Sequence, residues 1–409
     1  MKRTLFVASI CFLIFSCSKE KFTNHINNNT VDNSTTVSTG LVYISKGFGY
    51  DSATLYALDI KTGSINWQFT NSVIFSRFSY TPCIAENTLF MQVQQGSTQE
   101  GTSLIALNAR TGRLIWKTTL NHNGFTSITN PTFENGNVYV AAEKKLFCLN
   151  ATNGNINWKK QYDSSTSDNE LCSPTVQNSS IYIGNKKHFF ALNAADGSIK
   201  WQVDADLRTS TATVASGLVT FINSDDGQIK AYDFKGILQW QSKINDYLVG
   251  STTVSQNIVY QYATDPASSI NYFGLNISNG SKAWEYKQPK DNNQNNRIYG
   301  DPFYIENTLY ITLADSLIAI NAKDQATKKW SYYTGVPVCN NCYARSSVVA
   351  GRGLVFDMAL DNNLYALSAK DGKLLWKFAA NDGSSYSYSP VILFSDGVAI
   401  HPTNSGMTQ

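Results

Sequence analysis

The chain has 409 residues, of which 42% are hydrophobic, 12% aromatic and only 15% charged. With 33 basic against 30 acidic residues and a formal net charge of +3, it lacks the basic stripe that nucleic-acid binding requires. Its richness in Tyr, Phe, Val, Ile, Thr, Asn and Gly is typical of an all-β protein, and a single β domain of this length needs a repeated architecture.

The N-terminus has the features of an export signal. Lys2 and Arg3 precede an apolar run from Leu5 to Phe15 that is too short to span a bilayer. The run ends in Ile-Phe-Ser-Cys, which resembles the lipobox of bacterial lipoproteins, where a signal peptidase cuts before the cysteine and its thiol is diacylated. This predicts a signal peptide over residues 1–16 and a lipid anchor on Cys17. The alternative is an ordinary secretory signal in which Cys17 has no role.

Residues 17–40 are predicted to form a flexible tether. They consist largely of Asn, Thr and Ser, and such a segment buries too little apolar surface to offset the entropy of ordering it. A flexible coil of about 22 residues spans roughly 25 Å, enough to hold a folded body clear of lipid headgroups. Removing Lys2 and Arg3 from the 33 basic residues leaves 31 against 30 acidic ones, so the mature chain is nearly neutral.

Residues 41–409 contain a repeat marked by tryptophan. The eight tryptophans recur at intervals of 39 to 49 residues, which is the period of propeller blades. They are Trp67, Trp116, Trp158, Trp201, Trp240, Trp284, Trp330 and Trp376.

Each tryptophan ends a similar phrase, as in residues 57–67, 106–116 and 191–201. The phrase predicts an apolar strand, a turn opened by Asp or Asn, a glycine at a position of positive φ, and the strand that carries Trp. A second hairpin lies upstream, as in residues 173–193, so four strands form one blade. The prediction is an eight-bladed β-propeller of four-stranded antiparallel blades.

The phrase resembles the tryptophan-docking motif of the pyrroloquinoline-quinone (PQQ)-type propeller repeat, Ala-x-Asp-x-x-Thr-Gly-x-x-x-Trp. The resemblance covers Leu41 to about Pro402, and it implies that each indole packs between blades and donates its N–H to a backbone carbonyl. Three repeats depart from the motif and are expected to have altered turns. Residues 231–240 are one residue short, residues 319–330 are one long and lack the glycine, and Ser368 replaces the Asp in the last.

The two ends of the repeat region are predicted to share one blade. The region opens with strands at 41–45 and 55–58 but without the preceding innermost strand, and residues 389–394 form an innermost strand without its tryptophan. Joining them closes the ring and removes exposed strand edges. Residues 398–401 give one strand more than this arrangement uses.

An enzyme is not expected. The quinoprotein dehydrogenases that bear this repeat combine a Ca²⁺ held by Glu and Asn, an Asp base and an adjacent Cys-Cys disulfide against the quinone, and no such set can be assigned in this sequence. The four histidines lack metal-ligand spacing and are expected at the surface or in loops: His25, His122, His188 and His401. Asn223–Gly227 resembles half of a calcium loop but is better interpreted as a hairpin turn. No cofactor and no metal are therefore predicted.

The local cysteine pair Cys339 and Cys342 lacks the His of a haem attachment site. In an oxidising envelope a small loop disulfide is the favoured interpretation, with a redox or metal role as the alternative. Cys83 and Cys148 fall in predicted strands, where buried thiols are expected.

The connection from each outermost strand to the next innermost strand is expected to cross one face and to carry partner-binding residues. Aligned on the proline that follows, or its equivalent, these connections place aromatic or Arg residues two and four positions earlier in three consecutive blades. Such a cluster has the composition of an interaction hot spot, although it could also only pack the channel entrance. This predicted partner-binding arc consists of Phe78, Tyr80, Tyr343, Arg345, Tyr386 and Tyr388.

Anchor, tether and eight blades together are similar to the propeller lipoprotein subunit (BamB-like) of the outer-membrane β-barrel assembly machinery. The resemblance implies a monomeric, non-catalytic scaffold at the outer membrane that binds envelope proteins, including barrel-assembly components. A glycan- or polymer-binding surface lipoprotein is the first rival, favoured by the Tyr-rich arc and the near-neutral charge. A PQQ-dependent dehydrogenase is the second.

Overall fold

In the computed structural model, the residues described are 39–46, 53–71, 77–78, 81–94, 101–121, 128–162, 170–207, 211–244, 247–248, 250–264, 270–287, 300–313, 315–322, 327–335, 347–359, 361–379 and 389–402. Within these ranges all the regular secondary structure is β-strand. No helix long and apolar enough to cross a membrane is found there. The chain divides into Met1–Thr35 and Thr36–Gln409, and all strands belong to the second unit. The predicted signal peptide and Cys17 lie outside the described residues.

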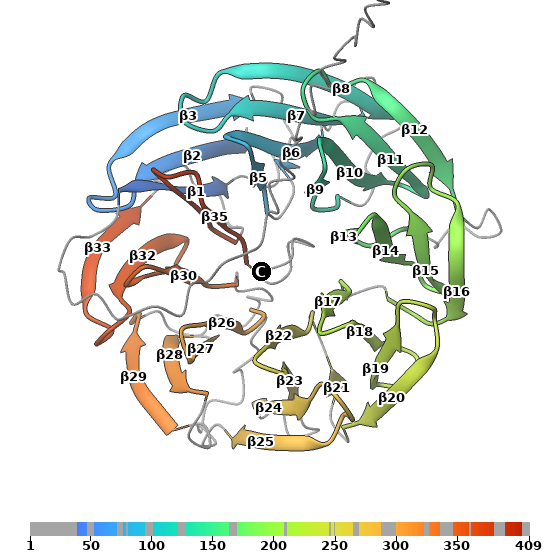
Figure 1. Ribbon diagram of the computed structural model, residues 1–409. Coiled ribbons are helices and arrows are strands. Elements are labelled where there is room, and N and C mark those ends of the chain that lie inside the picture. Colours follow the sequence, from blue (N-terminus) through green and yellow to red (C-terminus); the bar gives the residue numbers. More distant parts are fainter. Residues whose placement is uncertain are drawn as a thin grey trace, which may run out of the picture. The chain divides into compact units, whose positions relative to one another are not determined.

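Eight antiparallel sheets follow one another around a ring, which confirms the predicted eight-bladed propeller (Figure 1). We number the blades by their tryptophans in chain order. Blades 1 to 4 contain, from inside to outside, β34 (Val391–Phe394), β1 (Gly40–Lys46), β2 (Ala53–Asp59) and β3 (Ile65–Asn71); β5 (Cys83–Ala85), β6 (Thr88–Gln94), β7 (Thr102–Asn108) and β8 (Leu114–Asn121); β9 (Thr132–Glu134), β10 (Asn137–Ala142), β11 (Lys145–Asn150) and β12 (Ile156–Gln161); and β13 (Thr175–Gln177), β14 (Ser180–Gly184), β15 (His188–Asn193) and β16 (Ile199–Asp204).

Blades 5 to 8 contain β17 (Thr213–Ala215), β18 (Leu218–Asn223), β19 (Gln228–Asp233) and β20 (Leu238–Lys243); β22 (Thr253–Ser255), β23 (Ile258–Thr264), β24 (Ile270–Asn276) and β25 (Lys282–Lys287); β26 (Phe303–Ile305), β27 (Thr308–Thr312), β28 (Ser316–Asn321) and β29 (Thr327–Tyr333); and β30 (Val349–Gly351), β31 (Leu354–Met358), β32 (Asn363–Ser368) and β33 (Leu374–Ala379). Three short strands add to this plan: β4 (Arg77–Phe78) pairs with β6, β21 (Tyr247–Leu248) with β23, and β35 (Ala399–Ile400) with β34.

The tryptophan phrase folds into the same hairpin in blade after blade. In blade 1 Trp67 pairs with Ala57 and Ile65 pairs with Leu58, so Asn66 is an extra residue that forms a β-bulge. All eight blades show this register shift beside the tryptophan. A bulge increases the local twist of a strand, so each blade is twisted in the same way at its rim.

Tryptophans join neighbouring blades at the rim. All eight lie in the described residues, and seven donate the indole N–H to a backbone carbonyl of the next blade at 2.5–3.2 Å, as Trp67 does to Ala109. Under each of these seven indoles lies the turn glycine of the next blade. Gly112 has a φ of +70°, which favours glycine, and a Cβ there would come within 2.6 Å of the Trp67 ring. Both the backbone conformation and the lack of space therefore exclude a side chain at this position.

Of the three repeats that depart from the motif, two keep this contact. In the short turn of blade 5 the N–H of Gly236 donates to the carbonyl of Asp233, three residues earlier. In blade 1 the N–H of Gly63 donates to the carbonyl of Asp59, four residues earlier, so the turn of blade 5 is altered as predicted. The turn at Ser368 is not altered, because Gly372 donates to the Ser368 carbonyl just as Gly63 donates to that of Asp59. In blade 7 the residues between Ala322 and Thr327 lie outside the described ranges.

The ring closes as predicted, with β34 from the C-terminal part paired to β1 through Leu41 and Leu393. The strand that the sequence left unplaced is β35, which covers the inner edge of β34. It carries His401 into a buried position, where Nε2 accepts the N–H of Ile84 in blade 2 at 2.9 Å. His401 follows β35 in a segment without regular structure, as the expectation of a surface or loop histidine allows, but it is buried because it packs against blade 2.

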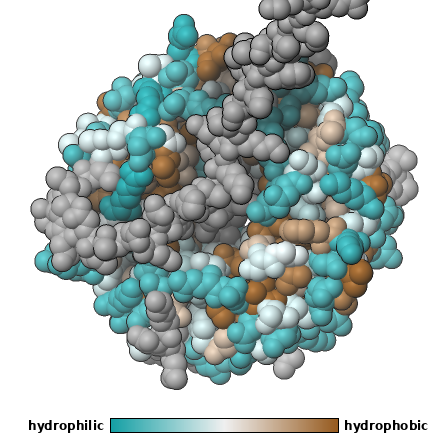
Figure 2. All heavy atoms as spheres, in the orientation of Figure 1, coloured by the Kyte–Doolittle hydropathy of each residue, from teal (hydrophilic) through white to brown (hydrophobic). Residues whose placement is uncertain are grey.

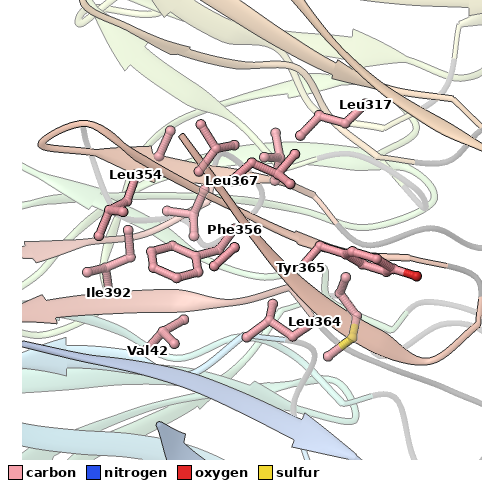
Figure 3. Packing of buried hydrophobic residues seen from close by; sticks show 14 of the residues in the cluster. Val42, Leu317, Leu354, Phe356, Leu364, Tyr365, Leu367 and Ile392 are labelled. Carbon is pink, nitrogen blue, oxygen red and sulfur yellow. The ribbon is translucent and has the colours of Figure 1, made fainter. Parts of the chain in front are cut away.

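Both neighbours of blade 1 hold the closing hairpin. Arg110 of blade 2 donates to the carbonyls of Phe394 and Ser395 at 3.2 and 3.1 Å. Arg352 of blade 8 bonds Asp396 at 2.6 Å and lies 4.1 Å above the Phe394 ring. The core beneath is continuous across blades 7, 8 and 1 (Figure 3), with Leu317, Phe356 and Val42 in one buried cluster. This packing makes blade 1 a full member of the ring although its strands come from both ends of the sequence.

Candidate functional site at the inner ends of the blades

A ring of short polar side chains joins the blades where each innermost strand begins. In each blade this position lies two residues before the first residue of the innermost strand. We call these residues the polar ring: Thr81, Asn130, Ser173, Thr211, Ser251, Asp301, Ser347 and Ser389.

Consecutive members of the polar ring are hydrogen-bonded from the backbone of one blade to the side chain of the next. Six such links have donor to acceptor distances of 2.8–3.2 Å, and they join Thr81 to Asn130, Asn130 to Ser173, Thr211 to Ser251, Ser251 to Asp301, Asp301 to Ser347, and Ser347 to Ser389. Because every link spans two blades, the ring fixes the backbone at the point where each connecting segment joins its blade. The sequence signal was present in the Ser/Thr-Pro steps, but we interpreted it only as an alignment mark.

Asp301 is the one titratable residue of the polar ring. It is 5% exposed, and its Oδ1 accepts the Ser251 N–H at 2.8 Å. Burial raises the pKa of this carboxyl to about 7, an effect that the hydrogen bond from Ser251 only partly opposes. Gly250 makes the room, since a Cβ there would overlap with Oδ1.

The polar ring also corrects our alignment of one connection. Ser347 accepts the N–H of Asp301 and donates its own to Ser389, so it occupies the ring position of blade 8. The equivalent of proline is then Val348, and Tyr343 and Arg345 lie five and three positions before it instead of four and two. The repeat has no proline at this step, which left the alignment free to slip by one residue.

Most of the predicted partner-binding arc lies outside the described residues, namely Tyr80, Tyr343, Arg345, Tyr386 and Tyr388, as do Cys339 and Cys342. For Phe78 the backbone is described, and it pairs with Val93 in the short strand β4. Seven of the eight tryptophans are structural links between blades, as the motif implies, and Trp284 is the exception.

The remaining predicted single residues fall as follows. Cys83 and Cys148 are buried in β5 and β11, as expected, and burial raises the pKa of both thiols. Residues 223–227 form the hairpin turn between β18 and β19, in which Asp226 pairs with Lys230 at 2.7 Å. Within the described ranges no cluster of three or more His, Cys, Asp or Glu could hold a metal ion.

A second polar cluster lies in blade 8. Asp361 Oδ2 accepts hydrogen bonds from the Tyr365 hydroxyl at 2.7 Å and from Lys377 at 3.1 Å, and Lys377 lies 4.8 Å above the Tyr365 ring. These donors and Asn363 hold the pKa of Asp361 below its ordinary value despite partial burial. This cluster could not be predicted from the sequence, because its members are ordinary surface residue types.

Hydrophilic and small apolar areas alternate over the face seen in Figure 2.

The sequence pattern of the outer membrane protein assembly factor BamB matches this chain over residues 19–171 and 168–377. The chain belongs to the BamB family. BamB from Moraxella catarrhalis has a similar structure, at 18% identity and a TM-score of 0.52 over 82% of this chain and 90% of that chain. This agrees with the PQQ-like repeat and the BamB resemblance that the motifs predicted.

Enzymes share the same architecture with this BamB-family chain. A quinohemoprotein alcohol dehydrogenase from Pseudomonas putida HK5 matches at 12% identity and a TM-score of 0.55, over 80% of this chain and 74% of the dehydrogenase. At such identities the likeness shows the fold alone. Tetrathionate hydrolase from Acidithiobacillus ferrooxidans is 31% identical over 117 residues, or 28% of this chain, and the match spans 21% of the hydrolase.

Proposed function

We propose that the chain is a membrane-anchored, non-catalytic scaffold that binds other envelope proteins during outer-membrane protein assembly. The observation that carries the proposal is the BamB family match, which extends through both halves of the ring. Membership in that family supports an envelope-associated protein with protein partners. The anchor is Cys17, at the end of the apolar run, and the tether of residues 17–40 gives the ring its reach.

A non-catalytic role is supported by what two buried titratable groups do in the described part of the chain. Asp301 carries a link between blades 6 and 7, and His401 accepts a hydrogen bond that holds the closing hairpin. Both groups thus have structural tasks. In the sequence, the adjacent Cys-Cys pair of the quinoprotein dehydrogenases is missing.

The connections between blades are the expected contact surface, because the polar ring holds the points at which they enter the next blade. A scaffold of this kind presents variable segments on a fixed frame. Tyr80 and Tyr388 lie at equivalent alignment positions in blades 2 and 1, two residues before Pro82 and Pro390. These two tyrosines are our first candidates for partner contact.

The test is crosslinking of the anchored protein in its native cells, affinity purification and mass spectrometry, with Cys17→Ser as the unanchored control. Recovery of barrel-assembly components with the wild type and their depletion with Cys17→Ser would support the scaffold. Recovery of polysaccharide-uptake proteins instead would favour the glycan-binding rival and contradict the proposal.

A second comparison locates the contact surface. The variant Tyr80→Ala/Tyr388→Ala is expected to lose captured partners, whereas the exposed pair Lys159→Ala/Lys200→Ala on the outermost strands is expected to keep them. Equal capture by both variants would exclude the connections of blades 1 and 2 as the contact.

A further inference from the structure

At seven boundaries a tryptophan N–H bonds a carbonyl of the next blade and a turn glycine lies under the indole, a pair of contacts that we call the tryptophan lock. Among the described residues, the boundary between blades 6 and 7 does not show this lock. Trp284 should donate to blade 7 at the place of Ala322, by analogy with Trp67 and Ala109. Its indole N–H is buried, yet it has no acceptor in the part of the chain that the structure describes. A buried donor without an acceptor lowers the stability of the fold, because it has lost its hydrogen bonds to water and gains none in the protein.

The residue paired with Trp284 also differs from the other blades. The residue paired with tryptophan is alanine in six blades and Cys148 in blade 3, but in blade 6 it is Gly274. A Cβ on Gly274 would overlap with Nε1 of Trp284. The indole nitrogen therefore faces its own blade, in space that a methyl group fills elsewhere, instead of facing blade 7.

Blade 7 lacks the other half of the lock. At the seven closed boundaries a turn glycine lies against the indole face, for example Gly280 under Trp240. The phrase of blade 7, residues 319–330, has no glycine and is one residue longer. Donor, supporting strand and receiving turn thus depart from the motif at the same boundary.

The described residues keep other contacts at this boundary, including apolar packing of Trp284 and Tyr286 in a cluster with Ile318 of blade 7. Ser251 of blade 6 bonds the carboxyl of Asp301, and Tyr260 stacks on Tyr304 with ring centroids 5.4 Å apart. Tyr272 donates its hydroxyl to the Thr312 carbonyl at 3.2 Å. Gln256 and Asn307, in the turns that follow the innermost strands β22 and β26, are also hydrogen-bonded across the boundary at 2.8 Å.

We propose that the ring opens between blades 6 and 7, where the outer part of blade 6 separates from blade 7 while the other boundaries stay closed. Local opening takes place where the free energy of separation is lowest, and one missing hydrogen bond with its glycine contact lowers it at this boundary alone. The proposal is independent of the function proposed above.

Exchange of the indole N–H groups with solvent tests it. The full chain labelled with ¹⁵N-tryptophan should give eight indole signals, each assigned by its own Trp→Phe variant. We expect the Trp284 N–H to exchange about five- to tenfold faster than the other seven, the factor that one net hydrogen bond is worth. An exchange rate for Trp284 within the range of the other seven would overturn the proposal.

A repair variant gives a second test. Gly274→Ala combined with Asp324→Thr, Gln325→Gly and deletion of Ala326 restores the motif in blades 6 and 7. Exchange at Trp284 should slow to the rate of the others, and the melting temperature should rise. If the variant keeps the circular dichroism spectrum of the wild type but the Trp284 exchange rate does not fall, the missing lock is not the cause and the proposal is wrong. The control is Gly112→Ala, which should speed exchange at Trp67 only.

Discussion

Replacing Asp301 by Asn should stabilise the protein, and the gain should grow with pH. Within the polar ring Asn130 already performs the same task, since its Oδ1 accepts the Thr81 N–H at 2.9 Å as the Asp301 Oδ1 accepts that of Ser251 at 2.8 Å. An amide keeps this acceptor and never ionises. The carboxyl is buried, and ionisation there costs solvation that the single bond from Ser251 does not restore.

The sign follows from the raised pKa. Asp301 titrates at about 7 in the folded chain and near ~3.9 in the unfolded one, so the folded state binds the proton more tightly. Its contribution to stability is fully present below pH ~4 and is lost as pH rises through 7. At about 1.4 kcal/mol per pH unit, the loss is on the order of 4 kcal/mol once the group is ionised.

Urea unfolding of the wild type and Asp301→Asn at pH 5 and pH 8 measures this effect. The advantage of the variant should be larger at pH 8 by a few kcal/mol. The reciprocal control is Asn130→Asp, which places a second carboxyl in the ring and should be more destabilising at pH 8 than at pH 5. An equal advantage at both pH values, or a less stable Asp301→Asn at pH 8, would refute the assignment of a destabilising buried carboxylate.

Three further outcomes are expected. Gly112→Ala should lower the melting temperature more than Gly136→Ala. The two glycines have similar φ values, +70° and +74°, but only Gly112 contacts an indole. The difference between the two variants therefore measures the tryptophan lock. Burial lowers the pKa of His401 to about 4, so its contribution should be present above pH ~6.5 and lost as pH falls through 4, and His401→Gln should unfold with a weaker acid dependence between pH 6.5 and 4. Arg110→Ala should lower the free energy of unfolding by about 1–3 kcal/mol in urea titrations, since it removes two hydrogen bonds from the closing hairpin.

The repeated parts of the fold could be predicted because each blade needs the same local solution. The glycine in the turn, the tryptophan four residues later and the small residue opposite it are all short-range requirements, and they recur in sequence at the blade period. Closure was also predictable, since a β1 without an inner partner and a β34 without a tryptophan complete each other.

Contacts between blades were harder to predict, because their partners lie about 40 residues apart and differ in type. The backbone of Thr81 bonds an Asn side chain, and that of Ser347 bonds a Ser. A pattern search for one residue type does not find such a ring. The burial of His401 was not predicted for a related reason, since it depends on a hairpin that only the closing blade has.

The polar ring changes how the predicted arc should be weighed. Residues two positions before the proline equivalent are comparable between blades only if the ring residue itself is aligned, and in blade 8 that residue is Ser347. Positions two and four before Val348 are then held by Ser346 and Ala344, not by Arg345 and Tyr343. Tyr80 and Tyr388 remain equivalent under the corrected alignment, so the prediction of an aromatic contact surface now depends on the connections that lead into blades 1 and 2.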